Sequence, residues 1–259
     1  MGRLGSTLIL GAGYTGEKVA RILETEGESV LRIRSSNFDL SLPGSVEKLY
    51  EFAPKDCVVL HSIPTLENGG DAKLLEGLKG KARRVVYLST TSVYGANKIV
   101  DLNTAIAPRS PRELARAATE AVVQSGPWEW LILRPAAIYG RERGVHISMA
   151  QGSYRLSGDG SNFISRIHVD DLARLTAAAL RSDLTGAYPV ADEHPCTARE
   201  IADYCARRFH LPAAVSADVQ EVPESRRADR KVDGRAIFKL LGVKLGYPSY
   251  AEGLSADLI

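Results

Sequence analysis

Short apolar runs alternate with amphipathic segments along the first half of the chain. The runs have the length of buried strands and occupy residues 8–10, 29–34, 57–61, 84–89 and 130–133. The intervening segments carry apolar residues at helical spacing, at 14–26, 46–52, 71–78 and 111–124. This alternation predicts an α/β fold, a Rossmann-type doubly wound parallel sheet with helices on both faces.

The regular alternation of strand and helix patterns ends after residue 140. Helical patterns are predicted at 169–180, 197–209 and 235–241, and the Pro- and Ala-rich residues 211–222 are typical of a linker or an edge strand. Thr197 and Glu200 have the spacing of a capping box at a helix start. We therefore expect a dinucleotide-binding core over 1–140, completed by about 164–182, and a smaller, mostly helical substrate lobe over 141–259.

Composition narrows the class of protein. The 259 residues carry a net charge of +2, which gives no reason to expect a nucleic acid or a membrane surface as partner. Three widely spaced cysteines without a CxxC motif favour a reduced, cytoplasmic setting, and the five histidines lack metal-ligand spacing, so no metal is expected. No apolar segment is long enough to span a membrane, and Gly11 and Gly13 interrupt the first apolar run, unlike a signal peptide.

The first apolar run leads directly into Gly11-x-Gly13-x-x-Gly16, which opens a helical pattern. Strand, glycine turn and helix in this order are typical of a dinucleotide-binding unit. In such a unit Gly11 permits the tight turn, Gly13 lets the pyrophosphate approach the backbone, and Gly16 lets helix and strand pack closely. The alternative is an ordinary glycine turn, which leaves the flanking pattern unexplained.

The end of the second predicted strand bears on the choice of dinucleotide. NAD-binding proteins often place Asp or Glu about 20 residues after the glycine turn, where it binds the ribose 2′-hydroxyl. Here Arg34 and Ser35 stand at that place, and a guanidinium and a hydroxyl can both bind a 2′-phosphate. NADP(H) is therefore favoured as cofactor, with NAD(H) as the alternative. Arg34 could also be merely solvated at a strand end.

Four motifs resemble those of the short-chain dehydrogenase/reductase superfamily, in its extended or atypical branch related to nucleotide-sugar epimerases and dehydratases. They are the glycine turn at 11–16, LSTTSVYG at 88–95, LRPAAIYG at 133–140 and IHVDDL at 167–172.

The resemblance implies roles for further residues. Asp39 and Leu40 would lie near the adenine, the strand ending at His61 and Ser62 would run beneath the cofactor, and Pro135 and Ala136 would lie along the nicotinamide ribose. The remaining cofactor positions that it implies are Tyr14, Thr15, Ser89 and Arg116.

The catalytic pair of this superfamily is altered. Its Tyr-x-x-x-Lys motif opens a long helix after a Pro-x-Ser-Pro turn, but here the matching residues are Arg112 and Arg116. Arginine stays protonated near neutral pH and is a poor general acid or base. Thr90 matches the family's hydroxyl residue that binds the reacting oxygen. Arg116 can take the place of Lys at the nicotinamide ribose. Arg112 can bind an anionic substrate, or it can be an ordinary exposed residue at the start of the helix.

A replacement proton donor is not evident from the sequence. Tyr94, Tyr139 and His168 are near the cleft in the family's fold, but each also has an ordinary packing or loop-holding role.

Three functions follow as hypotheses. The first is an NADP(H)-binding, epimerase/dehydratase-like oxidoreductase that uses Thr90, Arg112 and Arg116 on a small polar or anionic substrate, such as a nucleotide sugar. The second is a catalytically silent NAD(P)-binding sensor or scaffold, which the missing Tyr favours. The third, an α/β domain without cofactor, leaves the glycine turn and Arg34 unexplained. The superfamily's habit implies a monomer or a homodimer.

Overall fold

A computed structural model describes residues 6–34, 42, 44–64 and 70–256. Contacts between Cα atoms divide the chain into two compact units. The first comprises Met1–Val93, Pro108–Arg134 and Leu172–Tyr188, and the second comprises Tyr94–Ala107, Pro135–Asp171 and Pro189–Ile259.

The first unit is built on a central sheet. Over the described residues this sheet has six strands, in the order β11-β6-β4-β3-β1-β2. Their bounds are β1 Thr7–Leu10, β2 Val30–Ile33, β3 Cys57–His61, β4 Ala82–Leu88, β6 Glu129–Pro135 and β11 Gly186–Val190. Strands β2, β1, β3, β4 and β6 pair in parallel, as the sequence predicts. Leu10 is in register with both Ile33 and His61, so β1, β2 and β3 end at one edge of the sheet.

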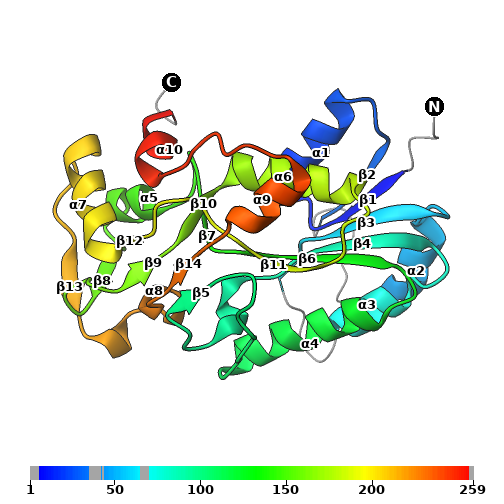
Figure 1. Cartoon of the computed structure of the whole chain (residues 1–259), viewed down its shortest axis with the longest axis horizontal. Helices are drawn as coiled ribbons and strands as arrows, with labels where there is room; N and C mark the ends of the chain where they lie inside the picture. Colours follow the sequence, from blue (N-terminus) through cyan, green and yellow to red (C-terminus); the bar gives the residue numbers. More distant parts are fainter. Residues whose placement is uncertain (1–5, 35–41, 43, 65–69, 257–259) are drawn as a thin grey trace. The chain divides into compact units, whose positions relative to one another are not determined.

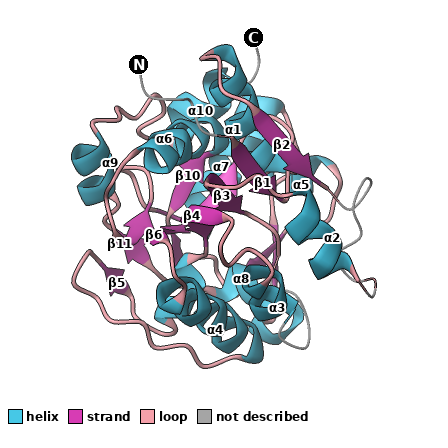
Figure 2. Ribbon diagram, turned by 90° about the vertical axis from the view of Figure 1, so that its right-hand side faces the viewer, coloured by secondary structure: helices cyan, strands magenta, loops and turns pink. Residues whose placement is uncertain are grey.

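Helices cover both faces of this sheet. Their bounds are α1 Tyr14–Thr25, α2 Ser45–Phe52, α3 Gly70–Glu76, α4 Pro111–Ser125 and α6 Val169–Arg181. Helices α1 and α6 lie on one face, and α2, α3 and α4 lie on the other (Figures 1 and 2). Leu8 and Leu10 of β1 pack in one core cluster with Leu49 of α2 and Leu74 of α3, whereas Ile9 points to the opposite face. The predicted doubly wound α/β fold is therefore confirmed.

The second unit combines short strands with helices. Its strands are β5 Ile99–Val100, β7 Ala137–Tyr139, β8 Arg155–Ser157, β9 Phe163–Ile164, β10 Arg166–His168, β12 Cys196–Thr197, β13 Val215–Ala217 and β14 Lys231–Val232. They form the pairs β10-β7, β12-β9, β13-β8 and β14-β5. Its helices are α5 Val145–Ala150, α7 Ala198–Phe209, α8 Glu224–Arg227, α9 Arg235–Leu241 and α10 Tyr250–Ala256.

Two local predictions in the second unit can be compared directly with the structure. Thr197 and Glu200 form the expected capping box at the start of α7. Residues 211–222, predicted as a linker or edge strand, contain β13, which pairs in parallel with β8.

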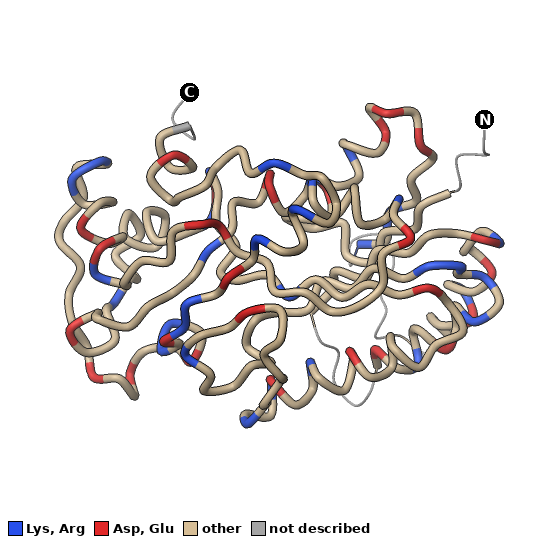
Figure 3. Tube along the Cα trace, in the orientation of Figure 1, with Lys and Arg blue, Asp and Glu red and all other residues tan. Residues whose placement is uncertain are grey.

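The structure shows where the charged residues and the three cysteines lie. Lys and Arg are interspersed with Asp and Glu along the trace (Figure 3). Cys57, Cys196 and Cys205 are buried and unpaired, and burial raises the pKa of the first two to about 11 and of Cys205 to about 12. Among the described helices, none combines the length and apolar character that crossing a membrane requires.

Candidate functional site

The glycine turn links β1 to α1 at the carboxyl edge of the sheet. The N–H groups of Gly11 and Ala12 both donate to the Ile33 carbonyl at 3.0 Å, which ties the turn to β2. A Cβ at Gly16 would lie 2.4 Å from the Gly11 carbonyl oxygen, so helix and turn pack too closely for any side chain there. The same Cβ would lie 3.2 Å from the Ile9 side chain of β1, so helix and strand also pack closely here, as the spacing of the motif predicts.

Gly13 is different, because the space around it is open. A Cβ at Gly13 would meet no atom of the described structure within 4 Å, and the residue is exposed. Gly13 is also the N-cap of α1 and has no side chain to bond the first N–H groups of the helix. Backbone donors, a positive helix end and open space are the features that a bound phosphate needs.

Ser62 and Ile63, which follow β3, pack against the glycine turn. The Ser62 hydroxyl donates to the Gly11 carbonyl at 2.8 Å, and its N–H donates to the Leu10 carbonyl. A Cβ at Gly11 would lie 2.7 Å from the Ile63 side chain. The segment after β3 therefore holds the turn in place, which fits a position beneath a ligand.

His61, the last residue of β3, is completely buried. Its Nε2 lies 3.0 Å from the Asp71 Oδ1 of α3, and its ring packs against Tyr87 with 4.8 Å between centroids. His61 is thus a packed residue below the turn.

Arg116 of α4 points toward this same buried group. Its Nη1 donates to the Tyr87 hydroxyl at 2.8 Å and to the Ile63 carbonyl at 3.4 Å. Burial raises the pKa of Tyr87, and the neighbouring Arg116 charge opposes the rise in part. Arg116 is therefore held against Tyr87 near the end of β4 and against Ile63, which follows β3.

Helix α4 begins with a second capping box, which fixes where its arginines lie. The Ser110 hydroxyl accepts from the Glu113 N–H, and the Glu113 carboxylate accepts from the Ser110 N–H. Arg112 in the first turn is exposed, and Arg116 one turn later is half-buried.

Thr90 and Ser89 follow β4 but have different surroundings. Thr90 is half-buried and its hydroxyl accepts from the Ser92 N–H at 3.2 Å. The buried Ser89 hydroxyl donates to Glu120 at 2.6 Å, and Glu120 also accepts from Arg134 in a bidentate ion pair at 3.0 and 2.7 Å. Ser89 is thereby directed into the protein interior.

Arg34 follows β2 directly and pairs with Glu17 of α1. Glu17 also accepts from Arg21 and Arg32, and Arg32 forms two further hydrogen bonds of 2.6 Å with Glu24. Arg34 is therefore not simply solvated at a strand end.

The other predicted cofactor positions are distributed as follows. Thr15 is buried and Tyr14 half-buried in the first turn of α1. Pro135 and Ala136 belong to the second unit, where the Ala136 N–H donates to the Val190 carbonyl at 2.8 Å. Ser35, Asp39 and Leu40 lie outside the described residues.

The three alternative proton donors are packed in the second unit. Tyr94, Tyr139 and His168 are all buried. The Tyr139 hydroxyl donates to the Ser249 carbonyl at 3.0 Å, and the His168 ring contacts Tyr247 with 4.0 Å between centroids.

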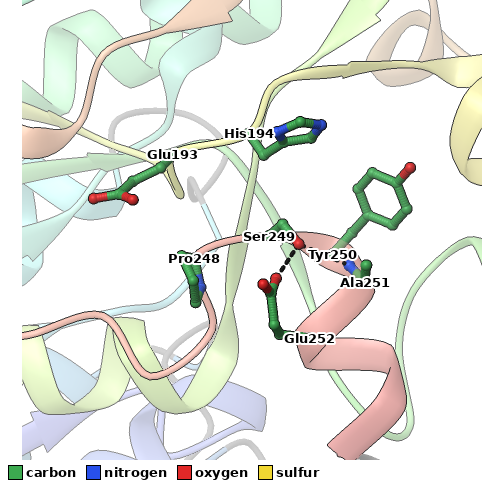
Figure 4. Close-up of a pocket in the computed structure, with 7 residues that line it drawn as sticks. All are labelled: Glu193, His194, Pro248, Ser249, Tyr250, Ala251 and Glu252. Atoms are coloured by element: carbon green, nitrogen blue, oxygen red, sulfur yellow. Dashed lines mark hydrogen bonds between the residues drawn. The ribbon is translucent and has the colours of Figure 1, made fainter.

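A hollow of about 500 Å³ also lies within the second unit. The residues that line it come from the loop after β11 and the start of α10, and they are Glu193, His194, Pro248, Ser249, Tyr250, Ala251 and Glu252 (Figure 4). None of the site residues predicted from the sequence lines this hollow. Over the described chain, no group of three or more His, Cys, Asp or Glu is arranged to hold a metal ion.

The sequence did not indicate three residues near the glycine turn. Glu17 bonds Gly13, and Asp71 and Tyr87 both contact His61. Glu17 precedes Arg21 by four residues on a predicted helix, a spacing that signals an ion pair. Tyr87 stands inside an apolar strand, where a buried hydroxyl signals a hydrogen-bond partner. Asp71 gives no comparable signal.

Comparison with known proteins supports the reading of the motifs. A model of the NAD dependent epimerase/dehydratase family matches residues 67–191, a little under half of the chain. A curated relative from Streptomyces sp, a 3-diazoavenalumate denitrifying reductase, is 31% identical over 161 residues, which cover 55% of this chain and 52% of the relative. The chain thus spans about half the length of this relative.

Solved structures share the fold over nearly the whole chain. A functionally unknown conserved protein from Silicibacter pomeroyi is 26% identical with a TM-score of 0.78, covering 98% of both chains. UDP-glucose 4-epimerase from Thermotoga maritima, solved with UDP-glucose, is 19% identical with a TM-score of 0.79, covering 98% of this chain and 97% of that one. The Thermus thermophilus UDP-glucose 4-epimerase, solved with NAD, is 20% identical with a TM-score of 0.78, covering 96% of both. The family model supports an assignment to the epimerase/dehydratase-like part of the short-chain dehydrogenase/reductase superfamily, and the solved structures share the fold.

Proposed function

We propose that the first unit binds a nicotinamide dinucleotide, with NADP(H) preferred, and that the protein is an oxidoreductase of the epimerase/dehydratase type. The observation that carries the proposal is the open space at Gly13 beside the N-terminus of α1. A pyrophosphate fits there, because the backbone can be approached and the helix end attracts negative charge. The NAD-bound Thermus epimerase and the reductase from Streptomyces support a nicotinamide cofactor.

The proposed roles of the side chains follow from their positions in the first unit. Arg34, at the end of β2, binds the 2′-phosphate of NADP(H). Arg116 is held by Tyr87 at the family's Lys position, and we assign it to the nicotinamide ribose. The bound nicotinamide supplies or accepts a hydride.

Substrate recognition is proposed for Thr90 and Arg112. The Thr90 hydroxyl would bind the reacting polar group, and the exposed Arg112 would bind an anionic group, since a guanidinium can hold a carboxylate or phosphate with two hydrogen bonds. Arg112 stays protonated and therefore does not supply a proton as the family's Tyr does. A small anionic substrate, of which a nucleotide sugar is one example, suits this arrangement.

A parallel thermal-shift titration with NADPH, NADP⁺, NADH and NAD⁺ tests the cofactor. A ligand that binds only the folded protein raises the melting temperature once its concentration exceeds the dissociation constant. We expect a larger shift with the phosphorylated pair. No shift with any of the four would contradict the proposal.

The missing Tyr favours one alternative, a catalytically silent NAD(P) sensor or scaffold. A screen of carbonyl compounds and nucleotide sugars for NADPH consumption separates the two functions. Turnover that falls in Thr90→Ala and Arg112→Ala without unfolding supports the enzyme. Dinucleotide binding with no turnover across the screen supports the silent protein.

A further inference from the structure

The side chain of Arg34 is already engaged by a carboxylate of the same unit. It pairs with Glu17, four positions into α1, and it keeps 43% of its surface exposed. The proposed 2′-phosphate ligand would therefore approach a guanidinium that has an internal anionic partner.

Glu17 is the shared acceptor of an arginine cluster. Arg21 and Arg32 each donate to it through Nε at 3.1 Å, in addition to the pair with Arg34. Glu24 is the second carboxylate of the cluster, and it bonds Arg32 through both of its oxygens at 2.6 Å. In the described contacts Arg34 is therefore paired with Glu17, whereas Glu24 bonds Arg32.

Glu17 carries its negative charge at neutral pH. Partial burial raises the pKa of its carboxyl, but hydrogen bonds from Arg21 and Arg32 and the charges of Arg32 and Arg34 outweigh burial, so the pKa lies below its ordinary range. A phosphate arriving at Arg34 would meet this carboxylate as a like charge and as a competitor for the same N–H donors.

The location of the pair makes this competition relevant to the dinucleotide. Arg34 follows Ile33, whose carbonyl accepts the N–H groups of Gly11 and Ala12, and Glu17 donates its own N–H to the Gly13 carbonyl. Both residues of the pair are thus joined by the backbone to the glycine turn. A ligand placed by that turn has its adenosine ribose beside the end of the second strand.

We propose that Glu17 is a specificity-determining residue that restrains the preference for NADP(H), because it competes with the 2′-phosphate for Arg34. Discrimination between the two dinucleotides is then set by the Glu17–Arg34 pair and not by Arg34 alone. This inference rests on the proposed binding of a dinucleotide to the first unit.

The test is the ratio of the NADH and NADPH dissociation constants, measured by calorimetry on the whole chain. Glu17→Gln removes the competing charge and keeps the side-chain length. We expect NADPH to bind about fivefold more tightly, the scale of an exposed ion pair, with NADH changed less than about twofold. Arg34→Ala should remove most of the preference for NADPH.

Glu24→Gln is the matched control. It removes one negative charge from the same cluster, but from a carboxylate that bonds Arg32 and not Arg34. We expect it to leave the ratio of dissociation constants nearly unchanged. An equal gain in Glu24→Gln, or equal effects of Glu17→Gln on NADPH and NADH, would overturn the role of Glu17. Wild-type protein that binds neither dinucleotide would instead overturn the proposed function, and the inference with it.

Discussion

Arg116 Nη1 donates a 2.8 Å hydrogen bond to the hydroxyl of Tyr87, and this bond joins α4 to the buried end of β4. Tyr87 in turn packs edge-on against His61, which lies 3.0 Å from Asp71. Arg116 is thus the outermost member of a chain of side-chain contacts that reaches into the core of the first unit.

Tyr87→Phe should destabilise the protein by about 1–2 kcal/mol, since a charged donor loses its partner in a poorly solvated place. Chemical denaturation measures the change. Tyr188→Phe is the control, because its hydroxyl bonds the Thr185 carbonyl at the surface and its loss should cost less than about 0.5 kcal/mol. Equal stability of Tyr87→Phe and wild type would show that the bond to Arg116 contributes nothing.

Glu120→Gln should cost about 3 kcal/mol of stability. The substitution leaves Arg134 buried without a full counter-charge and weakens the bond from Ser89. Asp233→Asn breaks the exposed pair with Arg235 and should change stability by less than about 1 kcal/mol. Similar losses in the two variants would contradict the distinction between buried and exposed pairs.

Two substitutions in the glycine turn should separate packing from binding. Gly16→Ala should destabilise the fold by about 1–3 kcal/mol, because its Cβ would clash with the Gly11 carbonyl. Gly13→Ala meets only open space and should stay within about 1 kcal/mol of wild type, the scale of a weakened cap. Denaturation curves of both variants test this, and the reverse order would contradict the geometry.

Asp192 should make stability fall as pH rises. Burial raises the pKa of its carboxyl to about 8, with His194 and Arg166 opposing and Asp171 and Glu252 adding to the rise. The folded protein therefore holds this proton over a range, from about pH 4 to about pH 8, in which the unfolded chain has lost it. Folding binds a proton there, so this group lowers stability by up to about 1.4 kcal/mol for each unit of rising pH.

Asp192→Asn should remove that dependence and keep an acceptor for the His194 N–H, which donates to Oδ1. The stability gained over wild type should be absent below pH 4 and should grow toward pH 8. Denaturation at several pH values measures it. A gain that does not vary with pH would show that Asp192 ionises normally in the folded protein.

Hydrophobic patterning predicts the central sheet because its strands are apolar and its helices amphipathic. Residues 57–61 are a strand in both the prediction and the structure, and the other predicted elements of the sheet and its helices differ at their ends by a few residues. Strand β11 was not predicted, because Gly186-Ala-Tyr-Pro-Val190 contains Gly and Pro, which are rare inside strands. The strand tolerates both because it lies at the edge of the sheet and is only partly buried. The short strands of the second unit have too few residues to show a period.

Some residues of the candidate site can be predicted from the sequence, and others are brought together only by the fold. Gly11, Gly13 and Gly16 are predicted from a local strand–turn–helix pattern. Arg112 and Arg116 are predicted only from the resemblance, because they stand where the superfamily's Tyr-x-x-x-Lys motif is expected. The pairs Glu17–Arg34, His61–Asp71 and Glu120–Arg134 join residues that are distant in sequence. Such pairs depend on the fold, and no local pattern specifies them.

The dissociation constant of NADPH for wild type and for Gly13→Ala tests the central claim most directly. We predict that wild type binds NADPH more tightly than NADH, and that Gly13→Ala binds NADPH at least about tenfold more weakly at nearly unchanged stability, because a methyl group fills the space proposed for the pyrophosphate. Undetectable binding to wild type, or equal affinity in the variant, would contradict a dinucleotide site at the glycine turn.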